Sequence, residues 1–74
     1  MFLKDVKVGE NCIVEDINLN MNMKRRLEAL GMTHEAPVFV LNKKGPGIMI
    51  VSMRGSRFAL GSNITGRITV RMER

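Results

Sequence analysis

The stretch MKRRLEALGM, residues 23–32, decides the fold because it carries the one clear helix signal in a chain otherwise full of strand signals. Met23, Leu27 and Leu30 recur at positions i, i+4 and i+7, which places a narrow apolar stripe along one side of a helix. The charged residues between them flank this stripe or point away from it. We therefore expect a helix of about two turns that lies on a small β-structure.

Both ends of this helix carry capping signals. Asn20 or Asn22 can cap the start, because a short amide side chain accepts a hydrogen bond from a free N–H group of the first turn. Gly31 stands where the helix should stop, since glycine adopts the left-handed conformation without a Cβ penalty. In a helix ending of this kind, Met32 returns onto Leu27.

Strand signals occupy the rest of the chain. Strands are expected at residues 12–17, 38–41, 48–53, 57–60 and 67–73. The turn-forming segment 42–47 predicts a hairpin over 38–53, and the broken alternation near Glu15-Asp16 predicts a bulge. The pattern predicts a mainly β fold, a small barrel of about five strands with one short helix inserted after the first strand.

The length of 74 residues leaves room for one core, so we expect a single domain over residues 1–74. The residues expected to be buried share apolar side chains on the helix stripe or on strand runs: Leu27, Leu30, Val38, Val40, Ile50, Val51, Phe58, Leu60, Ile68 and Val70. Among the seven methionines, Met23, Met49, Met53 and Met72 also fit core positions.

Three apolar residues near the helix have two interpretations. Met21, Leu30 and Met32 can pack in the core, which is the default, or form an exposed apolar patch for a partner.

Charge is distributed unevenly along the chain. Residues 1–35 carry five basic and six acidic side chains, a balance of −1, whereas residues 36–74 carry seven basic and one acidic, a balance of +6. The basic half suggests an acidic partner, such as nucleic acid or an anionic membrane face, but it also fits an ordinary soluble surface. The apolar runs are too short to span a bilayer, and the start resembles no signal peptide. We therefore expect a cytoplasmic protein.

The sequence offers no residues for catalysis, a cofactor or a stable metal site. Its one histidine, His34, has no placed partner, and its one cysteine, Cys12, starts a strand and reads as a small buried residue. The segment 42–47 superficially resembles a phosphate-binding loop but lacks the Gly-Lys-Ser/Thr ending and leads into a strand rather than a helix. We expect a non-enzymatic protein without cofactor or metal.

The order of these signals resembles the FeoA family, small cytosolic partners of the bacterial ferrous-iron transporter FeoB. The matching pieces are Val8-Gly9-Glu10 with Ile13, residues 25–32, residues 38–40, Pro46-Gly47, Phe58-Ala59-Leu60 and Ile68-Thr69-Val70. One departure lies after the helix, where family members usually carry a Pro-Gly pair and this chain has His34-Glu35. Two others, at Gly61 and Thr65-Gly66, affect turns and surface rather than the core pattern.

The resemblance implies an SH3-like barrel, which also occurs as the C-terminal domain of iron-dependent repressors. It implies a non-enzymatic cytosolic adaptor that supports ferrous iron uptake by docking on the cytosolic region of FeoB, recruited to the inner face of the membrane. Weak homo-oligomer formation is a further expectation. The candidate partner-binding residues combine the polar face of the helix, the methionine that follows it and arginines of the basic half: Lys24, Arg25, Glu28, Met32, Arg54, Arg57 and Arg71.

Two alternatives stay open. The first is a small basic barrel that binds RNA or DNA, an interpretation weakened because Phe39 and Phe58 lie within apolar runs rather than on an exposed stacking surface. The second is an SH3-like peptide-binding domain related to that of the iron-dependent repressors, acting on a peptide or a metalloregulator.

Overall fold

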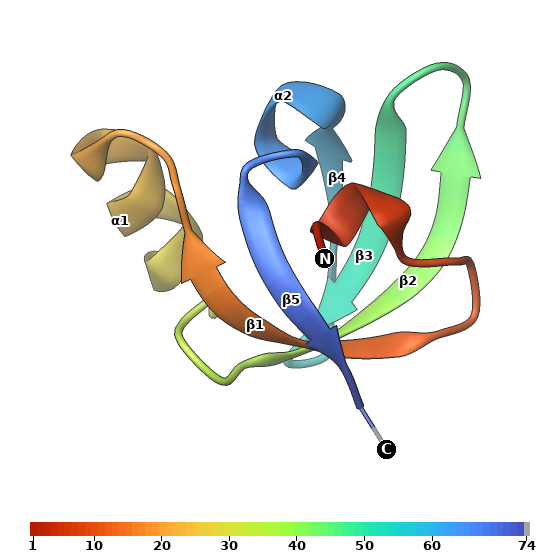
Figure 1. The fold of residues 1–74 in the computed structure, drawn as a ribbon, viewed down its shortest axis with the longest axis horizontal. Helices are drawn as coiled ribbons and strands as arrows, with labels where there is room; N and C mark the ends of the chain where they lie inside the picture. Colours follow the sequence, from red (N-terminus) through yellow and green to blue (C-terminus); the bar gives the residue numbers. More distant parts are fainter. Residues whose placement is uncertain (74) are drawn as a thin grey trace.

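The structure, a computed structural model, describes residues 1–73, so the last residue of the predicted domain, Arg74, lies outside the described residues. Three short helical segments and five strands follow one another along the chain (Figure 1). In order they are η1 (Leu3–Asp5), β1 (Asn11–Ile17), α1 (Met21–Ala29), β2 (Pro37–Lys44), β3 (Ile48–Met53), β4 (Ser56–Gly61), α2 (Ser62–Thr65) and β5 (Ile68–Met72).

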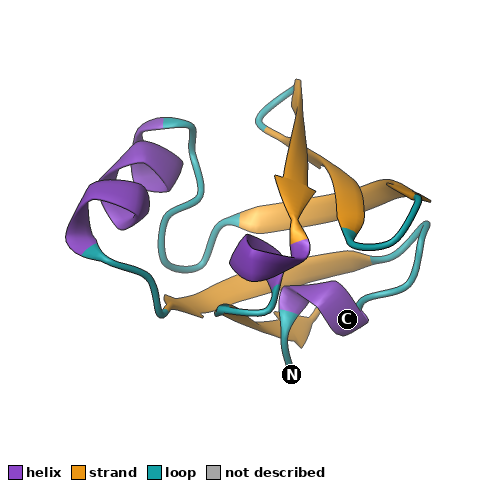
Figure 2. Ribbon diagram, turned by 90° about the horizontal axis from the view of Figure 1, so that it is seen from above, coloured by secondary structure: helices purple, strands orange, loops and turns teal. Residues whose placement is uncertain are grey.

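All five strands belong to one antiparallel sheet with the strand order β4-β3-β2-β1-β5. The sheet curls strongly on itself, as Figure 2 shows, without a hydrogen-bonded ladder between β4 and β5 in the described chain. The predicted mainly β fold with one short helix after the first strand is confirmed, including the hairpin over β2 and β3.

Two irregularities bend this sheet. The register of β1 against β5 shifts between Val14 and Asp16, which confirms the predicted bulge. A second shift lies between Val40 and Asn42 in β2, and no break in the sequence pattern had indicated it. A bulge increases the local twist of its strand, so these two sites help to curl the sheet around the core.

The helix α1 begins and ends as its sequence predicts. Asn20 provides the cap, since its Oδ1 accepts a hydrogen bond from the N–H of Met23 at 2.9 Å. At the other end the N–H of Gly31 donates to the carbonyl of Glu28 at 3.0 Å, and the N–H of Met32 donates to that of Leu27 at 2.9 Å. This pair of bonds is a Schellman ending, with Gly31 in the left-handed region at φ 110°.

The burial of the helix stripe corrects one prediction. Leu27 is buried, but Leu30 is 45% exposed, and the fully buried residue beyond the helix is Met32. The physical reason is the direction of the helix: α1 projects from the side of the sheet and meets it only through its inner side (Figure 1), so that of its nine residues Leu27 alone is buried. Leu30, the C-cap residue, lies past the point of contact.

The remaining core prediction is largely confirmed. Val38, Val40, Val51, Leu60, Ile68 and Val70 are buried, whereas Ile50 and Phe58 are only half-buried. Leu3 and Val6 of the N-terminal segment are also fully buried, although neither was among the residues expected in the core. This segment is held against β5, because the N–H of Val70 donates to the carbonyl of Met1 at 2.8 Å and Phe2 bridges Thr69.

Leu27→Ala should destabilise the protein by about 2–5 kcal/mol, the usual cost of a cavity at a buried leucine. Leu30→Ala is the matched control on the same helix and should change the free energy of unfolding by about 0.5 kcal/mol or less, as exposed positions do. Urea denaturation followed by circular dichroism measures both. Equal losses for the two variants would contradict the packing described above.

Candidate functional site

The polar face of α1 lies open to solvent. Arg25 and Glu28 are exposed, and Lys24 is half-buried. Lys24 and Glu28 line one wall of a shallow pocket of about 170 Å³ between α1 and β1, with His34 on the connection to β2 at its rim. The helix face therefore continues into the segment that follows the helix, which the sequence had marked only as a departure from a family pattern.

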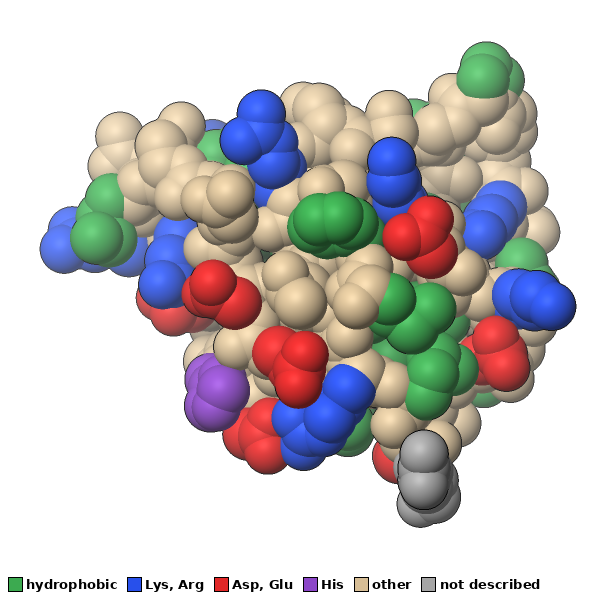
Figure 3. Space-filling view, viewed as in Figure 1, with side chains coloured by type: hydrophobic (Ala, Val, Ile, Leu, Met, Phe, Trp, Pro, Cys, Tyr) green, Lys and Arg blue, Asp and Glu red, His purple; other side chains and the backbone are tan. Residues whose placement is uncertain are grey.

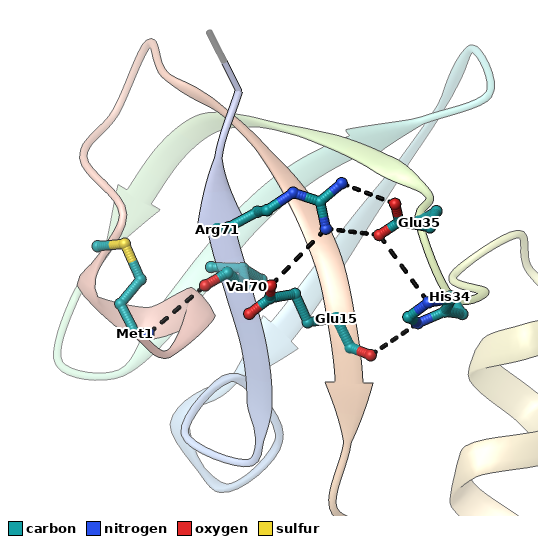
Figure 4. A network of polar contacts seen from close by, with 6 residues as sticks. All are labelled: Met1, Glu15, His34, Glu35, Val70 and Arg71. Atoms are coloured by element: carbon teal, nitrogen blue, oxygen red, sulfur yellow. Dashed lines mark hydrogen bonds and ion pairs between the residues drawn. The ribbon is translucent and has the colours of Figure 1, made fainter.

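A polar network begins at that segment and crosses to the edge strand β5 (Figure 4). Arg71 on β5 donates two parallel hydrogen bonds to Glu35, from Nη1 to Oε2 at 2.5 Å and from Nη2 to Oε1 at 2.7 Å. The same Nη1 lies 3.7 Å from the carboxylate of Glu15 on β1. A two-pronged guanidinium–carboxylate pair fixes geometry as well as charge.

His34 completes the network through both ring nitrogens. Its Nδ1 lies 2.8 Å from the backbone oxygen of Glu15, and since a carbonyl oxygen only accepts, Nδ1 carries the proton of this bond. Its Nε2 lies 4.0 Å from Oε2 of Glu35. The one histidine, purple in Figure 3, lies at the surface next to acidic side chains.

Glu35 adopts an unusual backbone conformation for a residue with a side chain. Its φ is 68°, in the left-handed region that favours glycine, and its N–H donates to the carbonyl of Val14 at 2.7 Å. This is the position of the glycine in the Pro-Gly pair that the resemblance leads one to expect. The paired hydrogen bonds from Arg71 hold the Glu35 side chain, lower the pKa of its carboxyl and raise the pKa of the guanidinium.

The other predicted residues lie in three different settings. Met32 is fully buried, so it packs in the core and offers no surface to a partner, which corrects its place among the candidate residues. The stem of Arg54 lies over the helix ending, where a Cβ built on Gly31 would meet Arg54 Cδ at 2.9 Å. Arg57 is exposed on β4, at the opposite end of the strand order from Arg71.

The structure thus brings together part of the predicted set and adds three residues. Lys24 and Glu28 line one pocket with Glu15 and His34, and Glu35 and Arg71 extend this region to β5. Together with Arg25, which is exposed on the same helix, we call these residues the helix surface. Sequence reasoning missed the three linking residues, although the His34-Glu35 departure from the family pattern pointed to two of them. Arg57 lies outside this surface.

The charged groups of the helix surface pair with one another or face solvent. Within residues 1–73, no group of three or more His, Cys, Asp and Glu residues is placed to hold a metal ion. The guanidinium of Arg71 itself occupies the space between the carboxylates of Glu15 and Glu35. In the described chain no helix is both long and apolar enough to cross a membrane.

The single thiol is sequestered. Cys12 is fully buried, and its Sγ lies 3.6 Å from the carbonyl oxygen of Val38. Burial, with a smaller effect from the nearby charge of Glu73, raises the pKa of the Cys12 thiol to about 11. A thiol with this pKa is protonated at neutral pH, and the protonated form is a poor nucleophile.

Comparison with known proteins gives a consistent family match. The FeoA domain model matches residues 1–72. A crystal structure of an iron uptake regulatory protein, FeoA, is 34% identical, with a TM-score of 0.86 over 96% of this chain and 95% of that chain. Stenotrophomonas maltophilia FeoA, solved with zinc, is 27% identical, with a TM-score of 0.79 over 96% of this chain and 89% of its own. That protein is described as an SH3 domain protein and a candidate activating factor for ferrous iron transport.

A more distant likeness shows the fold alone. A manganese-dependent transcriptional repressor is 21% identical, with a TM-score of 0.87 over 99% of this chain and 41% of its own. No curated protein matches the sequence.

The Arg71–Glu35 pair should make stability depend on pH. Because Arg71 lowers the pKa of Glu35, the pair stabilises the folded state above the pKa of an unfolded glutamate, roughly 4.3, and this stabilisation is lost as pH falls through the lower folded pKa. Glu35→Gln should therefore be less stable than wild type at neutral pH, and the difference should vanish in acid. Urea titrations across this pH range measure it. Glu28→Gln, an exposed glutamate without an ion pair to residues 1–73, is the control and should show no such difference.

The Cys12 thiol should resist alkylation while the protein is folded. At about pH 8 iodoacetamide should label the native protein far more slowly than the urea-unfolded protein, since burial keeps the thiol protonated. Mass spectrometry of quenched samples follows the reaction. Rapid labelling of the native state would show that Cys12 is accessible.

Proposed function

This chain belongs to the FeoA domain family, and from that membership we propose that it is a non-enzymatic adaptor that supports ferrous iron uptake by docking on the cytosolic region of the FeoB transporter. The observation that carries the proposal is the family match over residues 1–72. The description of the S. maltophilia relative as a candidate transport-activating factor supports it. The protein works in the cytoplasm, at the inner face of the membrane.

The helix α1 is the docking element in this proposal. Met21 is 60% exposed, and Arg25 follows it by one turn on the side of the helix away from Leu27. Arg25 makes no ion pair with residues 1–73, so its charge is available to a partner. An exposed thioether beside a free guanidinium suits a partner surface that combines apolar side chains with carboxylates.

The arginines near α1 differ in whether their charge is free to bind a partner. The guanidinium of Arg71 already pairs with Glu35 and Glu15, so a partner would have to break one of these pairs to bind it. Arg25 requires no such exchange. Within the helix surface we therefore assign the first electrostatic contact to Arg25 and a positioning role to the Arg71 network, which holds the connection after the helix.

Arg25→Glu should weaken binding to the cytosolic domain of the transporter several-fold, because an attraction of about 0.2–1 kcal/mol becomes a repulsion of similar size. Its melting temperature should stay close to that of wild type, and the loss should shrink as salt rises. Isothermal titration calorimetry at two salt concentrations measures both effects.

Arg57→Glu is the matched control, with the same charge change at an exposed position on β4. It should leave the affinity unchanged. Loss with Arg57→Glu alone would move the interface to the other end of the sheet. Failure of the wild type to bind the transporter domain, with nuclease-sensitive recovery of nucleic acid from cell extracts, would favour the RNA- or DNA-binding alternative.

A further inference from the structure

A pocket of about 220 Å³ lies on another part of the molecule, where η1, the turn between β2 and β3, and α2 meet. These three segments lie together in the upper half of Figure 1, although they are far apart in the sequence. The pocket is lined by Lys4, Lys43, Gly45, Gly47, Ile48, Met49, Ser62 and Thr65. Two lysines, Ser62 and two glycines of the turn therefore line a common space, and no acidic residue is among the lining residues.

The positive charge of this pocket is not neutralised from within the protein. Neither Lys4 nor Lys43 lies within ion-pair distance of a carboxylate of residues 1–73. Lys43 Nζ donates to the backbone oxygen of Lys4 at 3.3 Å, which places the ammonium at the junction of the two segments. This contrasts with Arg71, whose charge is matched by two glutamates.

The walls of the pocket are fixed by close packing. Gly47 has φ 90°, and a Cβ built on it would lie 3.0 Å from Ser62 Oγ, so the turn and α2 touch at this point. A Cβ on Gly66 would lie 3.6 Å from Lys4 Cδ, so the stem of Lys4 lies along the end of α2. Thr65 is only 2% exposed. The polar groups thus converge from parts of the chain that pack against one another.

We propose that this pocket binds the phosphate group of a small soluble phosphate compound. Ammonium groups act as point charges for phosphate, and hydroxyl groups donate hydrogen bonds to its oxygens. The pocket is smaller than the roughly 300–1,000 Å³ typical of whole small-molecule sites, so it holds a phosphate group and the first atoms attached to it. Ile48, 42% exposed, offers an apolar surface to those atoms.

Segment 42–47 contributes Lys43 and two glycines to this site. By its sequence alone this segment is a hairpin turn, because it lacks the Gly-Lys-Ser/Thr ending and the following helix of a phosphate-binding loop. The fold supplies groups from elsewhere: a hydroxyl comes from Ser62 at the start of α2, and the second lysine comes from η1. The site is therefore a tertiary one, and it is distinct from the helix surface.

The test is a titration of the full-length ¹⁵N-labelled protein, in a buffer without phosphate, with inorganic phosphate and with a nucleoside monophosphate. We expect saturable shifts of the backbone amides of Gly45, Gly47, Ser62 and Thr65. Lys43→Gln should weaken the affinity by about tenfold, as expected for the loss of one hydrogen bond to a charged group. Lys44→Gln, the adjacent exposed lysine that does not line the pocket, is the matched control and should leave it unchanged.

Ser62→Ala keeps the backbone and should also weaken binding, and the spectrum of each variant outside the pocket reports whether it is folded. Absence of saturable shifts, shifts centred elsewhere, or equal losses for Lys43→Gln and Lys44→Gln would overturn the proposal. Vesicles of phosphatidylcholine with and without phosphatidylglycerol form a second arm. Lys43-dependent binding to the anionic vesicles without any response to the soluble phosphates would overturn the soluble ligand in favour of a membrane headgroup.

Discussion

The left-handed turn at Gly31 is the constraint on which the arrangement of the helix and its surroundings depends. The residue must accept φ 110° and must leave space for the stem of Arg54, whose Cδ would lie only 2.9 Å from a Cβ. Any L-residue there would be strained and would displace Arg54. The turn reverses the chain within two residues and brings Met32 into the core, where it is fully buried. Leu30 is exposed for a different reason, because the helix that carries it projects from the sheet.

The segment after Gly31 contains a second backbone constraint, which lies at the surface. Glu35 is a second left-handed residue, and here a side chain rather than glycine occupies the position. The conformation is held from two sides, by the hydrogen bond to the carbonyl of Val14 and by the paired bonds to Arg71. Such strain persists where surrounding contacts determine the geometry. The network ties the connection after α1 to β1 and β5 and so fixes the base from which the helix projects.

Two polar regions of the molecule differ in their electrostatics, and the difference indicates what each can bind. In the network around Arg71, the cation and the carboxylates of Glu15 and Glu35 satisfy one another, so the region is suited to holding structure. The pocket between η1 and α2 is lined by two lysines, Lys4 and Lys43. Neither of them forms an ion pair with a carboxylate of residues 1–73. The net charge of +6 in residues 36–74 is thus not spread evenly over the surface, because one of the basic side chains, Arg71, is paired with carboxylates. Only its unpaired members can attract a charged partner.

The sequence by itself determined the elements that depend on local preferences: the Asn20 cap, the Schellman ending at Gly31, the β2–β3 hairpin, and the bulge near Glu15-Asp16. Each follows from backbone preferences within a few residues. Tertiary structure alone decided that Leu30 is exposed, that Arg71 pairs with Glu35 across 36 positions, and that Lys4 joins Lys43 and Ser62 around one pocket. The physical reason is that burial and pairing depend on how the helix is tilted against the sheet and on how the sheet curls. The periodicity of one segment specifies neither the tilt of the helix nor the curl of the sheet.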